Sequence, residues 1–213
     1  SRVSRGLGDV YKRQFGSTTK GASAVFDGSG DNIRFTNASQ YDIASDDDFC
    51  LEFYTKGDYE TNYSYGLGDY TNSYFLLQLG ANGVVYGYYG NGQANTLGDM
   101  TAYLTKGTSW HHIAYVRESG TYRLYIDGVQ RGTGTGGGTV AHDSARFDIG
   151  DAAESAGAPH LNGFISNLRF TVGAARYTGG TTFTVPTSTL TNDSSNVKSV
   201  SYTHLTLPTT PVV

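Results

Sequence analysis

The feature that most constrains the fold is an alternation of apolar and polar residues in short segments between clusters of Gly, Asn and Asp. Phe49, Leu51 and Phe53 share one face of the segment 48–56, for example. Successive side chains of a β-strand point to opposite faces, so a period of two indicates strands, whereas a surface helix needs a period near 3.6. No helical stretch stands out, and we therefore expect an all-β chain.

Nine segments are predicted to be strands, separated by loops rich in glycine. The strands are 23–26, 32–36, 48–56, 73–79, 83–89, 110–117, 121–127, 145–150 and 162–172, and the long loops are 57–72, 90–108, 132–144 and 151–161. Asn82-Gly83 and Asp127-Gly128 are dipeptides that tight hairpins prefer. Many short strands with regularly spaced turns predict an antiparallel two-sheet sandwich or barrel. The interior should hold Phe49, Leu51, Phe53, Trp110, Leu124, Leu168 and Phe170, with Phe164 on the same face as the last two.

The two ends of the chain do not read like protein. Codons for residues 9–14, DVYKRQ, resemble a transposon end used to fragment DNA for sequencing, and VSYTHLTLPTT from Val200 resembles its reverse complement with a primer tail. We therefore expect residues 1–14 and 199–213 to be adapter-derived and 15–198 to be one native domain. The alternative is a natural basic arm and a Thr/Pro-rich tail. An interrupted last strand could be replaced by adapter residues such as Val200, Tyr202 and Leu205.

The charge of the expected native part argues against two classes of partner. The chain has 15 basic and 19 acidic residues; without the four basic and one acidic residue of the ends, 11 and 18 remain, a net charge of −7. Nucleic-acid binding needs clustered Lys and Arg, so we expect no nucleic acid. No apolar run approaches the 18–20 residues of a membrane span, and we expect no membrane insertion. The single Cys50 lies in an apolar run and is expected to be a small buried residue.

Three segments carry a resemblance to a known family. They are AVFDGSGDNIRFTNASQYDIASDDDFCLEFYTK, WHHIAYVRESGTYRLYIDGVQRG and GFISNLRFTVGAARYTGGTTFTVPTSTL, which begin at Ala24, Trp110 and Gly163. In order and spacing they resemble the laminin-G-like jelly roll of the concanavalin A-like lectin/glucanase superfamily, in versions found in environmental phage virion proteins. The resemblance implies a two-sheet antiparallel jelly-roll sandwich, a glycan or cell-surface ligand, and an extracellular or virion location.

Enzymes of that superfamily carry an E-x-D-x-x-E pattern on one strand, which supplies two carboxylates for glycoside hydrolysis. The chain has no such pattern: Glu52 has no partner at the right offset. His111 and His112 are adjacent in a strand and point to opposite faces, so they cannot form one metal site. Arg169 and Arg176 are expected to have packing or ion-pair roles near Tyr177. We therefore predict no enzymatic activity.

Two binding sites remain as hypotheses. The resemblance implies calcium at one edge of the sandwich, where Asp27, Asp31 and Asn167 would supply the oxygen ligands that this ion prefers; the alternative is that these residues only cap turns.

A sugar site needs aromatic faces flanked by amides. Tyr86, Tyr88 and Tyr89, followed by Asn91, supply these groups, and further tyrosines nearby in sequence are Tyr63, Tyr65, Tyr70 and Tyr74. The alternative is that tyrosine is simply a good strand residue. The sequence thus predicts a non-catalytic carbohydrate-recognition or adhesion domain. The rival hypothesis is a structural or protein-interaction module that binds no sugar, with a glucanase-like hydrolase third.

Overall fold

The computed structural model describes residues 23–29, 31, 33–36, 42–57, 65–68, 77–79, 84–89, 93–104, 107, 109–136, 146–150 and 161–198. All regular elements in this part of the chain are β-strands, and it contains no helix that could span a membrane. The predictions for residues 1–14 and 199–213, and for Asn91, lie outside the described residues.

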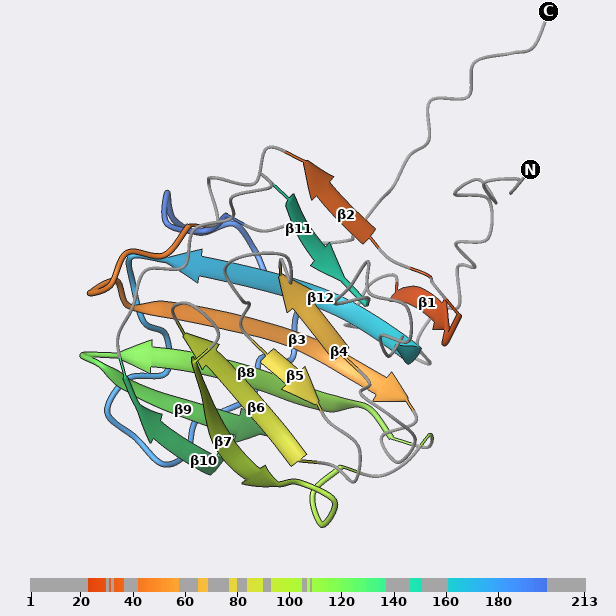
Figure 1. Cartoon of the computed structure of the whole chain (residues 1–213), viewed down its shortest axis with the longest axis horizontal. Coiled ribbons are helices and arrows are strands. Elements are labelled where there is room, and N and C mark those ends of the chain that lie inside the picture. The colour runs from red at the N-terminus through yellow and green to blue at the C-terminus, as the bar shows by residue number, and fades with distance from the viewer. Residues whose placement is uncertain are drawn as a thin grey trace, which may run out of the picture.

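The strands form two six-stranded antiparallel sheets (Figure 1). The first, here the β3 sheet, has the order β1-β12-β3-β8-β9-β10. Its strands are β1 (Ser23–Asp27), β12 (Asn162–Val172), β3 (Phe49–Gly57), β8 (His111–Glu118), β9 (Thr121–Ile126) and β10 (Val129–Thr135). The second, here the β6 sheet, has the order β2-β11-β4-β5-β6-β7. Its strands are β2 (Ile33–Thr36), β11 (Arg146–Ile149), β4 (Tyr65–Gly68), β5 (Leu77–Leu79), β6 (Val84–Tyr89) and β7 (Gln93–Asp99).

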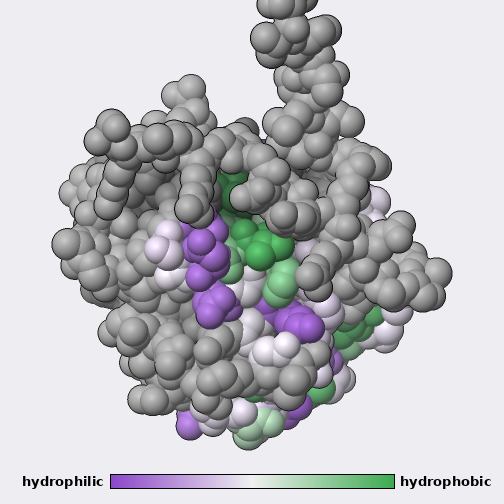
Figure 2. All heavy atoms as spheres, turned by 90° about the vertical axis from the view of Figure 1, so that its right-hand side faces the viewer, coloured by the Kyte–Doolittle hydropathy of each residue, from purple (hydrophilic) through white to green (hydrophobic). Residues whose placement is uncertain are grey.

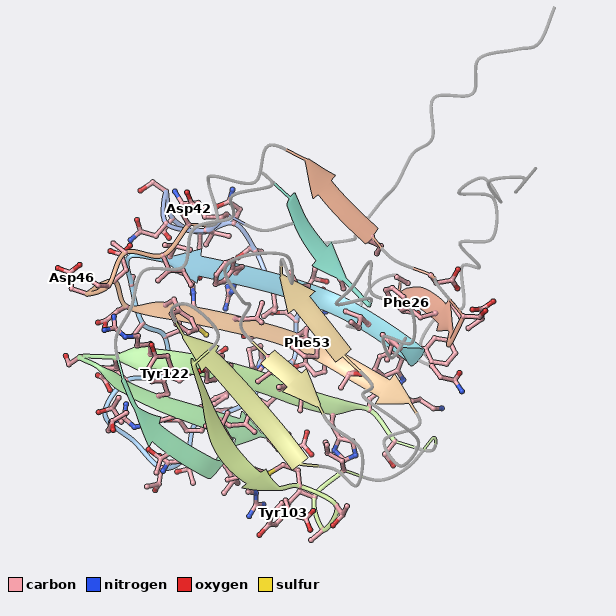
Figure 3. All side chains as sticks on the ribbon, in the orientation of Figure 1. Phe26, Asp42, Asp46, Phe53, Tyr103 and Tyr122 are labelled. Atoms are coloured by element: carbon pink, nitrogen blue, oxygen red, sulfur yellow. The ribbon has the colours of Figure 1, made fainter. Side chains whose placement is uncertain are left out.

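The main hydrophobic core lies between the two sheets. Phe53 and Tyr122 of the β3 sheet and Leu77 and Val85 of the β6 sheet belong to it, and Figure 3 shows Phe53 and Tyr122 inside the molecule. The predicted interior residues Phe49, Leu51, Phe53, Leu124, Leu168 and Phe170 are all buried in this core. Each buried side chain of this size contributes on the order of 1.5–3 kcal/mol, so the core is the main source of stability.

Trp110 and Phe164 are the exceptions to the predicted interior. Trp110 precedes β8, is only partly buried, and contacts the ring of Phe164 at 6.0 Å between centroids. The prediction that it anchors the core was wrong, because the positions that alternate with it, such as Ala114 and Val116, belong to the opposite face of the β3 sheet.

A β-bulge in β12 explains why Phe164 does not share a face with Leu168. The pairing of β12 with β3 shifts between Ser166 and Arg169, and Asn167 in this interval has a positive φ of 50°. The extra residue of a bulge inverts the alternation along the strand. Ile165 therefore faces the core before the bulge, and Leu168 and Phe170 face it afterwards.

All nine predicted strands are present, but β4, β7 and most of β10 lie in segments that were expected to be loops. Their sequences YGLG, QANTLGD and VQRGTGT have too little apolar alternation to be recognised. Both β7 and β10 end their sheets, where strands need fewer apolar residues. At this end the two sheets touch, because the position of Gly132 lies against the backbone of Leu97.

Candidate functional site

The outer face of the β3 sheet is covered by the chain's own last described segment, residues 173–198, here the cover segment. A second hydrophobic cluster of Cys50, Ala114, Val116 and Tyr125 lies on this face, away from the main core. Tyr177 and Phe183 of the cover segment pack on it, together with Ala175. Cys50 is a buried free thiol, as predicted, and burial raises its pKa well above the ordinary value.

Backbone hydrogen bonds attach the cover segment along its length. The Phe183 N–H donates to the Gly128 carbonyl at 2.8 Å, and the Lys198 N–H donates to the Phe170 carbonyl at 2.8 Å. The Tyr125 hydroxyl donates to the Gly180 carbonyl at 2.7 Å. This face of the sandwich is therefore closed by a structural part of the domain.

A buried charge cluster lies beneath the cover segment. The Glu52 side chain is fully buried, and its Oε1 accepts from Arg169 Nε at 2.8 Å. Its Oε2 accepts from the Tyr177 hydroxyl at 2.6 Å and from His112 Nε2 at 3.2 Å. Arg169 also contacts Asp193 at 3.3 Å, and Asp193 pairs with Arg176. The two arginines thus have the ion-pair roles that the sequence suggested.

The cluster keeps the Glu52 carboxylate ionised, and both of its oxygens accept hydrogen bonds from neighbouring side chains. Burial alone would raise the pKa of its carboxyl, but the hydrogen bond from His112, the Arg169 guanidinium and the Tyr177 hydroxyl together lower the pKa below its ordinary value. Burial and the neighbouring Glu52 carboxylate raise the pKa of Tyr177, so this hydroxyl remains a donor. Glycoside hydrolysis needs a proton donor or a free nucleophile in contact with solvent, and the buried, ion-paired Glu52 offers neither.

The sequence did not identify this cluster. A catalytic motif of this superfamily would pair Glu52 with a carboxylate on its own strand, whereas its partners lie on β8, β12 and the cover segment. One sequence feature could have indicated the cluster: Glu52 shares a strand face with Cys50 and Tyr54, and Arg169 lies in another predicted strand. Buried charges are paired in native proteins, so such a carboxylate predicts a cationic partner, although not which one.

His111 and His112 point to opposite faces, as expected. His111 Nδ1 lies 2.7 Å from Asp127 Oδ2, and His112 contacts Glu52 on the covered face. Among the described residues, no three His, Cys, Asp or Glu side chains converge in the manner of a metal site.

The three candidate calcium ligands do not come together. Asp27 and Asp31 are close, because the Asp27 N–H donates to Asp31 Oδ2 at 2.9 Å, and Asp27 Oδ1 accepts from Ser29 N–H at 2.8 Å. Asn167 is buried in the bulge of β12, whereas Asp27 pairs with Asn162 of the same strand. Asn162 and Asn167 are five residues apart, which corresponds to about 16 Å along a strand. The set of three does not fit one ion, and calcium stays a prediction for the exposed aspartates alone.

The candidate sugar-binding tyrosines lie in β6. The backbone of Tyr86, Tyr88 and Tyr89 is paired with β7, and Tyr86 also pairs with Gln78 of β5. Val85 and Gly87 are buried, and Gly87 lies against the Tyr115 ring in the core.

The comparisons with known proteins agree with this architecture. The model of the concanavalin A-like lectin/glucanases superfamily matches residues 27–175, which is more than half of the chain. No curated protein sequence matches the chain. Domains LG4-5 of the mouse laminin α1 chain are similar in structure, with a TM-score of 0.53 and 14% identity over 77% of this chain and 46% of that one.

Two further solved structures are similar at lower scores. Domain 4 of the extracellular arabinanase AbnA from Geobacillus stearothermophilus, in complex with arabinotriose, has a TM-score of 0.47 and 15% identity over 73% of this chain and 84% of that one. A SAP-like pentraxin from Limulus polyphemus has a TM-score of 0.45 and 15% identity over 70% and 74%. From the family match and the two-sheet fold, we conclude that this chain belongs to the concanavalin A-like lectin/glucanase superfamily.

Proposed function

We propose that this domain is a non-catalytic carbohydrate-recognition module that binds its ligand on the outer face of the β6 sheet. The observation that carries the proposal is the closed outer face of the β3 sheet, where Tyr177 and Phe183 of the cover segment pack on the sheet. A ligand on that face would have to displace a segment held by backbone hydrogen bonds at several points. The outer face of the β6 sheet is therefore the favoured place for a sugar.

The strand alternation of β6 supports this choice. Val85 and Gly87 are core-facing positions, and the positions of Tyr86 and Tyr88 alternate with them. A period of two assigns alternating positions to the outer face of the sheet. We therefore propose the positions of Tyr86 and Tyr88 as the centre of the sugar site.

The same geometry favours recognition over catalysis. The carboxylate of Glu52 is fully buried, and its oxygens accept hydrogen bonds from three side chains. Retaining hydrolysis needs two carboxylates about 5–5.5 Å apart that both reach the substrate. We further propose that the domain acts outside the cell or on a virion, as its resemblance to phage virion domains implies.

The test is binding of the full chain to an array of neutral and charged glycans. The variant Tyr86→Ala/Tyr88→Ala should lose binding by about tenfold or more, because a stacked aromatic contributes about 1–3 kcal/mol in comparable binding sites. The matched control is Tyr86→Phe/Tyr88→Phe, which keeps both ring faces and should retain most of the affinity.

Two results would contradict the proposal. Absence of glycan binding by a folded chain would favour a structural or protein-interaction module. Release of reducing ends from a glucan by the full chain would show a hydrolase.

A further inference from the structure

An exposed aromatic ring with an arginine stacked on it lies at the edge where the two sheets meet. The guanidinium carbon of Arg131 is 3.9 Å from the centroid of the Tyr103 ring. Tyr103 is 39% exposed, and Arg131 is also exposed. Figure 3 shows Tyr103 beyond the end of β7, at the rim of the molecule and far from Phe53 and Tyr122 in the core.

The turn that carries Tyr103 is held firmly. Met100 and Leu104, on either side of it in sequence, are buried in the main core. The N–H groups of Tyr103 and Leu104 both donate to the Met100 carbonyl, at 2.9 and 3.0 Å. Asp99 caps the start of the turn by accepting from the Thr101 N–H at 2.9 Å. The ring is therefore presented to solvent by a turn that is anchored on both sides.

Arg131 is aimed by a β-bulge. In the pairing of β10 with β9, Gln130 lies opposite Tyr125 and Gly132 lies opposite Leu124, so Arg131 is the extra residue. Bulges redirect a side chain and occur frequently next to binding sites. Gly132 fixes the bulge against the β6 sheet, because any side chain there would collide with the Leu97 carbonyl of β7.

The charge of Arg131 is not neutralised within the described part of the domain. Arg123, Arg169 and Arg176 each pair with a carboxylate there, whereas Arg131 contacts the Tyr103 ring. A guanidinium over the face of a ring has its N–H groups in its own plane, where two of them can donate parallel hydrogen bonds to a carboxylate or sulfate. The exposed ring offers apolar surface beside this donor.

We propose that Tyr103 and Arg131 form a subsite for an acidic sugar, with Arg131 binding the carboxylate and Tyr103 contacting the C–H groups of the sugar ring. This inference rests on the proposed carbohydrate-recognition function and names the ligand class: a saccharide that carries carboxylates or sulfate esters. It places this subsite at the β7–β10 rim, apart from the tyrosines of β6.

The experiment compares two ligands with the same sugar backbone, the charged oligogalacturonate and its uncharged methyl ester, by calorimetric titration of the full chain. Arg131→Gln should weaken oligogalacturonate binding by about tenfold or more, because a hydrogen bond to a charged group contributes about 1.5–3 kcal/mol. Arg131→Lys should retain only part of the affinity for oligogalacturonate, since an ammonium lacks the planar pair of donors. Tyr103→Ala should weaken the binding of both ligands.

The matched control is Arg123→Gln, which removes the same charge from an arginine that Glu118 already pairs with at 2.7 Å. This variant should bind oligogalacturonate like the natural chain. Equal affinity for both ligands, or equal losses in Arg131→Gln and Arg123→Gln, would overturn the subsite. Glycan binding that depends on Tyr86 and Tyr88, with the oligogalacturonate affinity unchanged in Arg131→Gln, would overturn it while leaving the proposed function intact. A lower melting temperature of Arg131→Gln with unchanged affinity would assign the stack a purely structural role.

Discussion

Replacing Glu52 by glutamine should destabilise the domain far more than removal of an exposed carboxylate. The substitution keeps the size of the side chain but removes the buried anionic partner of the Arg169 guanidinium, which is only 9% exposed. Removing one member of a buried ion pair costs about 3–5 kcal/mol. Arg169 retains Asp193 at 3.3 Å, and Asp193 is 45% exposed, so we expect a value near the lower limit, about 3 kcal/mol.

The assay is urea unfolding followed by the fluorescence of Trp110, the single tryptophan of the chain. The free energy of unfolding follows from linear extrapolation. The control is Asp46→Asn, at an exposed loop position labelled in Figure 3, which should change stability by less than about 0.5 kcal/mol. Glu52→Leu/Arg169→Met should recover much of the loss, because apolar residues of similar size often replace buried pairs without cost.

A Glu52→Gln variant as stable as Asp46→Asn would refute the reasoning. The reasoning would also be refuted if Glu52→Leu/Arg169→Met lost as much unfolding free energy as Glu52→Leu and Arg169→Met lose together when they are measured separately. Uncoupled residues give such additive effects.

Three further predictions follow from the described contacts. Acid should weaken the domain: the folded pKa of Glu52 lies below its ordinary value of 4.5, so its contribution is complete above that pH and is lost as the pH falls through the folded pKa. In chemical-denaturation experiments at decreasing pH, the free energy of unfolding should therefore fall steeply in acid, and it should fall less in Glu52→Gln. The same pH dependence in both proteins would contradict this. Asn167→Ala should lower the unfolding free energy by about 1–2 kcal/mol because Asn167 has a left-handed φ of 50°, whereas Asn167→Gly should cost less; equal losses in the two variants would contradict the conformational explanation. Calcium held by Asp27 and Asp31 would raise the melting temperature in excess Ca²⁺ relative to chelator, and Asp27→Asn would abolish the rise; no difference would remove calcium from the account.

The end of the molecule at the right of Figure 1 shows how far local reasoning reaches. Figure 2 views this end and shows hydrophobic residues between hydrophilic ones, on a face where β1 pairs with β12. The sequence correctly assigned both strands from their alternation. It could not tell that their register places Asp27 opposite Asn162 and leaves Asn167 further along the strand. Register depends on pairing between residues far apart in the chain, which a local pattern does not contain.

The sequence by itself determined the all-β class, the nine segments with apolar alternation and the buried face of β3, because side-chain alternation is a property of each strand alone. It missed β4 and β7 and most of β10, whose alternation is too weak to detect. Only the tertiary structure decided that both faces of β3 are buried, since the second face is closed by the cover segment. Glu52 meets Arg169 and Tyr177 across 117 and 125 residues, and Arg131 reaches Tyr103 through a bulge. These contacts arise from the stacking order of strands and from local departures from regular pairing, and neither is encoded in the period of a single segment.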